Sequence, residues 1–153
     1  MTREQYMEEA LALAREAAAA GEVPVGCVIV QGGRIVGRGR NRREEKRSTA
    51  SHAEMEAIAE ANAVLGTWRL EDCELYVTLE PCPMCAGAIL NARVKRVWYG
   101  TRDRAMGACG GVLNLFMEDF PNRPALVGGI LEEECRQVLS AFFRGLRRER
   151  EGR

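Results

Sequence analysis

The sequence of 153 residues lacks the features of a membrane or secreted protein. No apolar run approaches the ~18 to 20 residues that a membrane-spanning helix needs. The N-terminus, Met1 to Gln5, is polar and unlike a signal peptide. These absences exclude a membrane span and favour a cytoplasmic protein. Lysine is also scarce, because 20 of the 22 basic residues are arginine, and His52 is the single histidine.

The composition predicts one ordinary globular domain. Hydrophobic residues make up 46% of the chain and charged residues 29%, which is typical of a folded domain of this length. We find no internal repeat and no linker, so we expect residues 1–153 to form a single domain. Because no secretory signal is present, the six cysteines are expected to bind metal or pack as free thiols rather than form disulfides.

The net charge is zero, but the basic residues gather in three segments. These segments are residues 34–47, 93–104 and 136–153, and an acidic segment, 52–80, lies between the first two. Each segment alone is consistent with a solvated surface. If the three shared one face they would form a phosphate-binding track, for which arginine is well suited.

Hydrophobic periodicity predicts strands that alternate with helices. A helix over 7–20 and a hairpin of strands 23–30 and 34–40 come first, followed by a helix over 52–65. Ser51 and Glu54 have the spacing of a capping box for that helix. The remaining elements are predicted at 73–79 and 95–99 (strands), from 81–83 onward (short helix), at 125–127 (strand) and at 131–150 (helix). This order implies an α/β fold with a mixed central sheet and helices on both faces.

Four residues predict a catalytic zinc site. His52, Cys82 and Cys85 offer an imidazole and two thiolates, which suit zinc. Three protein ligands leave the fourth tetrahedral position open, as in catalytic rather than structural zinc sites. Bound zinc lowers the pKa of water from ~15.7 to roughly 7, which yields a nucleophile near neutral pH. Glu54 is then placed to carry protons.

Simpler interpretations exist for these residues. Glu54 could merely complete the capping box, although its position beside His52 favours the proton-carrying role. A C-x-x-C pair also occurs in redox sites and in structural zinc sites. A redox site would leave His52 unexplained, and a structural site needs a fourth ligand, for which Cys73 or Cys109 is a candidate.

The combined pattern of His52-Ala53-Glu54 and Pro81-Cys82-Pro83-Met84-Cys85 resembles the signature of the zinc-dependent cytidine deaminase superfamily. Within it, the chain resembles the bacterial tRNA-specific adenosine deaminases over nearly its whole length. The matching stretches are Glu22 to Gly26, Gly66 to Leu70, Leu75 to Ala88, Gly129 to Leu131 and Phe142 to Arg144.

The resemblance implies a three-layer αβα cytidine-deaminase-like fold, a homodimer with one zinc ion per subunit, and a hydrolase acting on the C–N bond of an amidine. Its reaction would convert the wobble adenosine of a tRNA anticodon stem-loop to inosine. His52, Cys82 and Cys85 would be the zinc ligands and Glu54 the catalytic proton shuttle. The implied substrate-binding residues are Asn41, Asp103, Phe142, Phe143 and Arg144, with Val23, Ala53 and Leu79 as candidates for the base pocket.

Two other functions remain open at this stage. The same zinc motif serves deaminases of a free nucleobase such as guanine or cytosine, but the basic C-terminal segment argues against a small substrate. The chain could instead be a zinc-stabilised RNA-binding module without catalysis. Glu54 argues against that alternative, because a structural site needs no proton carrier.

Overall fold

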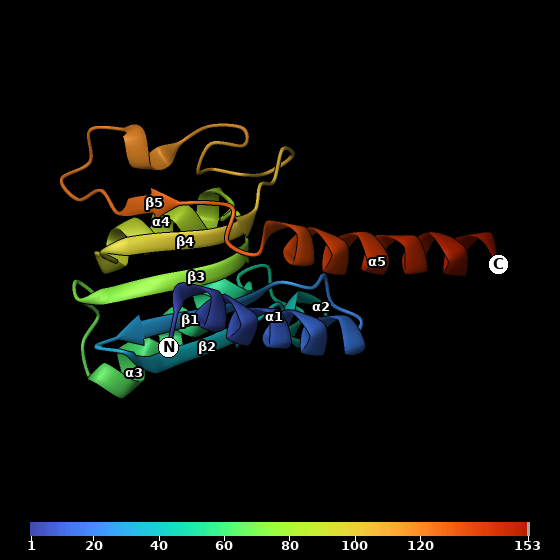
Figure 1. Cartoon of the computed structure of the whole chain (residues 1–153), viewed down its shortest axis with the longest axis horizontal. Helices are drawn as coiled ribbons and strands as arrows, with labels where there is room; N and C mark the ends of the chain where they lie inside the picture. The colour runs from blue at the N-terminus through green and yellow to red at the C-terminus, as the bar shows by residue number, and fades with distance from the viewer. Residues whose placement is uncertain (153) are drawn as a thin grey trace.

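The computed structural model describes residues 1–152 and is built on one five-stranded mixed sheet. The strand order is β2-β1-β3-β4-β5 (Figure 1). β1 is antiparallel to both β2 and β3, whereas β3, β4 and β5 are parallel. The strands comprise Gly26–Gln31 (β1), Arg34–Arg40 (β2), Cys73–Leu79 (β3), Arg96–Thr101 (β4) and Ala125–Val127 (β5).

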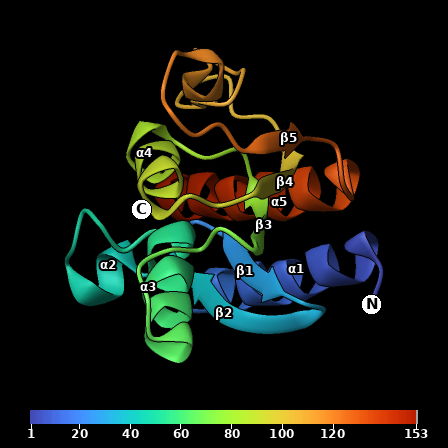
Figure 2. The ribbon, with the colours of Figure 1, turned by 90° about the vertical axis from the view of Figure 1, so that its left-hand side faces the viewer.

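Helices cover both faces of the sheet, which confirms the predicted three-layer αβα arrangement. Helices α3 and α4 lie on one face and α1 on the other (Figure 2). α5 begins beside α1 and extends beyond the ends of the strands (Figure 1). The helices comprise Arg3–Ala19 (α1), Arg43–Lys46 (α2), Ala53–Leu65 (α3), Pro83–Ala92 (α4) and Glu132–Glu151 (α5), with a 3₁₀ turn at Leu115–Met117.

The two-residue period of the strands divides the buried side chains between two cores. In β1, Ile29 packs with the residues of α3 and α4, whereas its neighbour Val28 packs with those of α1. In β3, Leu75 and Tyr76 are divided in the same way. Both faces of these central strands are therefore apolar, which explains their nearly continuous hydrophobic sequence.

Helix α3 lies directly against β2 because the facing residues are very small. A Cβ atom on Gly39 would lie 2.1 Å from the backbone oxygen of Ala53, and one on Gly37 would lie 2.3 Å from that of Ala57. Any larger residue at these glycines would push the helix away from the sheet. This close packing holds the first turn of α3, and with it His52, at a defined height above the strands.

The structure corrects three sequence-based predictions near the site. The first strand begins at Gly26 rather than residue 23, and a short helix, α2, follows the second strand, where no helix was predicted. The prediction of a capping box was wrong, because the N-cap of α3 is His52 and no side chain among residues 1–152 caps the helix. Glu54 is thus not used as a cap.

Among residues 1–152, none of the helices has both the length and the apolar character required for crossing a bilayer.

Candidate active site

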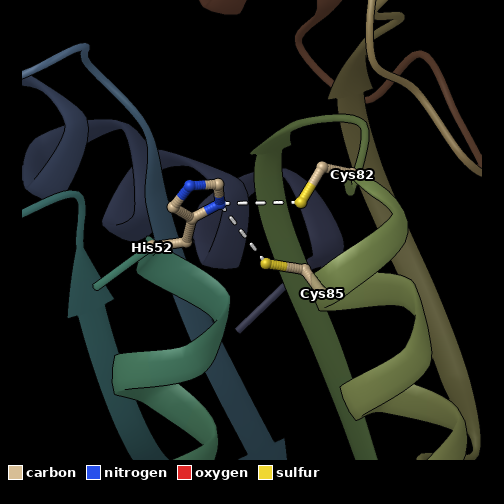
Figure 3. Close-up of side chains that lie close together, drawn as sticks. All are labelled: His52, Cys82 and Cys85. Atoms are coloured by element: carbon tan, nitrogen blue, oxygen red, sulfur yellow. Dashed lines mark hydrogen bonds between the residues drawn. The ribbon is translucent and has the colours of Figure 1, made fainter. Parts of the chain in front are cut away.

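Three metal-ligating side chains converge from two helix N-termini (Figure 3). His52 is the N-cap of α3, Cys82 is the N-cap of α4, and Cys85 lies in the first turn of α4. The Nδ1 atom of His52 is 3.6 Å from the sulfur of Cys82 and 3.6 Å from that of Cys85. All three ligand atoms lie within 4.8 Å of one another.

These distances fit a tetrahedral zinc ion. With Zn–S bonds of about 2.3 Å and Zn–N bonds of about 2.0–2.1 Å, tetrahedral angles separate nitrogen from sulfur by about 3.6 Å. Within residues 1–152, no fourth Cys, His, Asp or Glu side chain joins this group. Cys73 lies at the start of β3, roughly 20 Å from the strand's other end. The arrangement therefore matches an open, three-ligand site rather than a closed structural one.

The local electrostatics favour a thiolate beside His52. Hydrogen bonds from the Cys85 thiol and from His52 lower the pKa of Cys82 to about 4, although partial burial opposes this shift. The hydrogen bond to Cys82 in turn raises the pKa of His52. The Cys85 pKa is raised, because its thiol hydrogen-bonds to Cys82 and is buried. The lowered pKa of Cys82 favours its thiolate, which is the form that binds a metal cation.

Glu54 lies beside these ligands and is buried, with 4% of its surface exposed. Burial raises the pKa of its carboxyl group to about 7. It also lines a cavity of about 270 Å³ that contains His52 and Cys82, close to the lower end of the ~300–1,000 Å³ typical of small-molecule sites. A carboxyl group of this kind can accept and return a proton near neutral pH.

The same cavity brings together five of the eight residues suggested as substrate contacts. These are Val23, Asn41, Ala53, Leu79 and Asp103. The side chain of Asn41 is largely buried and its Nδ2 atom donates to the backbone oxygen of Val23 at 3.3 Å. Its Oδ1 atom is buried and has no hydrogen-bond partner among residues 1–152. Because such a group costs free energy unless it is paired, Oδ1 is an acceptor suited to a bound ligand.

Asp103 already has a structural role in its loop. Its Oδ1 atom accepts hydrogen bonds from the backbone amides of Ala105 and Met106, at 3.0 and 3.1 Å. This turn orders the cavity wall, and it occupies one carboxylate oxygen of Asp103.

The structure also adds cavity residues that were not predicted from the sequence. They are Val25, Arg43, Glu80 and Met106. Glu80 directly precedes Pro81 and Cys82, and a carboxylate beside the metal motif was a signal that could have identified it. Arg43 belongs to the unpredicted helix α2, so its position could not be inferred without that helix.

The three C-terminal candidates lie outside the cavity. Phe143 and Arg144 line a groove between α5 and the end of β4, whereas Phe142 faces a second groove between α5 and α1. The first groove holds four arginines: Arg102, Arg136, Arg144 and Arg147. We call it the arginine groove. Arg102 precedes Asp103, so the groove begins next to the wall of the cavity.

Within the part of the chain that the structure describes, the three basic segments do not form a single continuous face. Lys95 and Arg102 flank opposite ends of β4, which are separated by roughly 20 Å. Lys95 lies in a different hollow, together with Arg93 and Arg123. Strand direction therefore divides the segment 93–104, and only its second half joins the arginines of α5.

Comparisons with known proteins agree with this geometry. Residues 1–101 match the family model of the cytidine and deoxycytidylate deaminase zinc-binding region. The chain is 49% identical to the tRNA-specific adenosine deaminase of Bacillus subtilis, over 98% of this chain and 94% of that protein. A structure from a study of A-to-I editing by tRNA:A34 deaminases has a TM-score of 0.86 and 40% identity, covering 90% of this chain and 100% of that one. A structure of the guanine deaminase from Nitrosomonas europaea has a TM-score of 0.80 and 25% identity, covering 92% of this chain and 84% of that one.

Replacing one sulfur ligand tests the metal site. We expect wild-type protein to contain one zinc per chain and Cys85→Ala to bind zinc more than a hundredfold more weakly, because even outer-shell partners contribute ~10–100-fold. Zinc content after dialysis, measured by inductively coupled plasma mass spectrometry, checks this. Cys73→Ala is the matched control, since Cys73 is also a buried free thiol but lies at the far end of β3. Stoichiometric zinc in Cys85→Ala would contradict the assignment.

Proposed function

This chain belongs to the cytidine and deoxycytidylate deaminase zinc-binding family, and we propose that it converts adenosine at the wobble position of a tRNA anticodon to inosine. The observation that best supports this proposal is the open three-ligand metal site with Glu54 beside it. The cavity at this site lies next to the arginine groove. We further propose that the chain acts as a single deaminase domain, because both helical layers pack on the same sheet.

The residues of the cavity divide the work of deamination. When bound at His52, Cys82 and Cys85, zinc supplies a water of lowered pKa as the nucleophile. The Glu54 carboxylate takes a proton from the attacking water and delivers it to the leaving amine, so that adenosine and water yield inosine and ammonia. Asn41 accepts a hydrogen bond from the substrate through its unpartnered Oδ1 atom. Val23, Ala53 and Leu79 provide apolar contacts around the base.

The geometry favours a base presented by RNA over a free base. A cavity of about 270 Å³ can accept one extruded base, so a paired or stacked adenosine must leave its stack to react. The arginine groove starts at Arg102, one residue from the cavity residue Asp103. Guanidinium groups there can bind the phosphates that flank the extruded base. A free base has no phosphates for these arginines.

Single-turnover deamination of an anticodon stem-loop whose wobble base is adenosine tests the proposal. We expect wild-type protein to produce inosine at that base. Glu54→Gln should lower the rate by about 10²–10⁴-fold, the usual contribution of a general acid–base group, and should retain zinc. Nucleoside analysis of the digested RNA by mass spectrometry measures the product.

Glu56→Gln is the matched control for that experiment. Glu56 lies two residues along the same helix, and its carboxylate pairs with Lys46 Nζ at 2.8 Å outside the cavity. The Glu56→Gln variant should deaminate the stem-loop at the wild-type rate. Turnover of free guanine or cytosine without inosine in RNA would favour a nucleobase deaminase, in line with the similarity to a guanine deaminase. RNA binding without any inosine would favour a non-catalytic module.

The salt dependence of RNA binding tests the arginine groove. Arg144→Gln together with Arg147→Gln should weaken stem-loop binding and reduce the slope of log K against log salt by about 1.5, since each lost phosphate contact changes it by ~0.7–0.9. The control is Lys95→Gln with Arg123→Gln, which removes the same charge at the far end of β4. Fluorescence anisotropy at several salt concentrations measures both. Equal slopes for the two double variants would contradict the groove's role.

We also propose that two copies of the chain form a homodimer. Support comes from five exposed apolar side chains within one segment, residues 106–120, namely Met106, Val112, Leu113, Met117 and Phe120. Exposed apolar surface of this kind is typical of protein contacts where it is contiguous. Light scattering should give about twice the 17.0 kDa mass of one chain. A mass of one chain at micromolar concentration would exclude a stable dimer.

A further inference from the structure

A second buried carboxylate in the cavity wall has no part in the proton transfers described above. Glu80 follows the last residue of β3, and its side chain is fully buried. Its Oε1 atom accepts a hydrogen bond from the backbone amide of Asp103 at 3.0 Å. Its Oε2 atom accepts from the amides of Cys109 and Gly111, at 2.9 and 2.8 Å. One carboxylate thus holds three amides of a single loop, residues 103–111.

The loop fits closely around this carboxylate. A Cβ atom on Gly107 would lie 2.2 Å from Oε2 of Glu80, and one on Gly111 would lie 2.0 Å from the backbone oxygen of Asp103. Only glycine leaves enough space at either position. The amide of Ala108 also donates to the backbone oxygen of Pro81 at 2.8 Å. Residues 103–111 are therefore packed around the Glu80 carboxylate and the backbone of Pro81.

This loop carries parts of both proposed substrate contacts. Asp103 and Met106 line the cavity, and Arg102, which directly precedes the loop, lines the arginine groove. The Nε atom of Arg102 lies 3.9 Å from Oε1 of Glu80. The bonds from Glu80 thus set the position of the cavity wall and of the first arginine in the groove.

We propose that Glu80 is a positioning residue that holds the 103–111 loop in its RNA-binding conformation before RNA arrives; this rests on the proposed function. Hydrogen bonds to a charged acceptor are stronger than those between neutral groups, so the carboxylate keeps the loop in one conformation. If the bonds were weakened, the binding-competent fraction of the protein would fall. The apparent dissociation constant would rise in inverse proportion to that fraction. Bound RNA would still meet an intact Glu54 and intact metal ligands.

Glu80→Gln tests the proposal with little change in side-chain size. In either orientation its NH₂ group faces a backbone N–H, so at least one of the three amides loses its acceptor. We expect KM for the anticodon stem-loop to rise about tenfold or more, the equivalent of one lost hydrogen bond to a charged group. The expected kcat and zinc content are those of wild type.

Hydrogen exchange tests the loop independently of catalysis. In the zinc-loaded protein without RNA, the amides of Cys109 and Gly111 should exchange faster in Glu80→Gln than in wild type. This measurement stands even if wild-type protein makes no inosine, so failure of the proposed function and failure of this inference are distinguishable. Unchanged exchange and unchanged KM would overturn the inference, as would a lower kcat at unchanged KM.

A second variant decides the question if Glu80→Gln loses zinc or unfolds. Gly111→Ala retains Glu80, but its Cβ atom would meet the backbone oxygen of Asp103 at 2.0 Å and Oε1 of Glu80 at 2.9 Å. The loop must therefore shift away from the carboxylate, and KM should rise at unchanged kcat and zinc content. An unchanged KM in Gly111→Ala would overturn the inference. Glu74→Gln is the matched control, because Glu74 is on the same strand and accepts from Trp98 Nε1 at 3.4 Å, at the end away from the cavity. It should match wild type in both constants.

Discussion

The convergence of two helix N-termini above one end of the sheet is the constraint on which the site depends. His52 begins α3, and Cys82 begins α4. The unpaired amides at a helix start favour a thiolate, and the small residues between α3 and β2 hold His52 at the height of the two sulfurs. The 3.6 Å distances from Nδ1 of His52 to the two sulfur atoms therefore depend on the backbone arrangement as well as on the three side chains. A shift of either helix would separate the ligands.

Buried carboxylates hold the segments that form the two walls of the cavity. Glu80 holds the loop on one side of the cavity. On the other side, Glu22 is 1% exposed and accepts from the amides of Glu44 and Glu45 at 3.1 and 2.7 Å. Because α2 has no side-chain cap of its own, Glu22 satisfies amides at its start. Each wall is thus held by a charge from another part of the chain, which preorganises the cavity.

Local patterns in the sequence predicted elements that depend on local forces. The strands at 34–40, 73–79 and 125–127 have the predicted bounds, because short segments with β-branched and other apolar residues, bounded by turn and polar residues, mark them directly. Helix α2 was missed because it buries none of its residues and its amides are held by the distant Glu22. The capping box failed for a similar reason, since tertiary packing places Glu54 in the cavity. The metal ligands were predictable because zinc requires particular atoms at short range.

In the proposed function, the position of Arg102 would connect recognition of the base with recognition of the RNA backbone. It extends from the loop that forms the cavity wall, and its guanidinium group donates to the Tyr99 hydroxyl at 3.2 Å while lining the arginine groove. A phosphate bound there would lie beside the base in the cavity, on a loop that Glu80 already orders. In the proposed function both contacts would come from neighbouring residues, so binding at either place would lower the cost of ordering the other. A free base would gain only the cavity contacts, which gives a physical reason for selecting RNA.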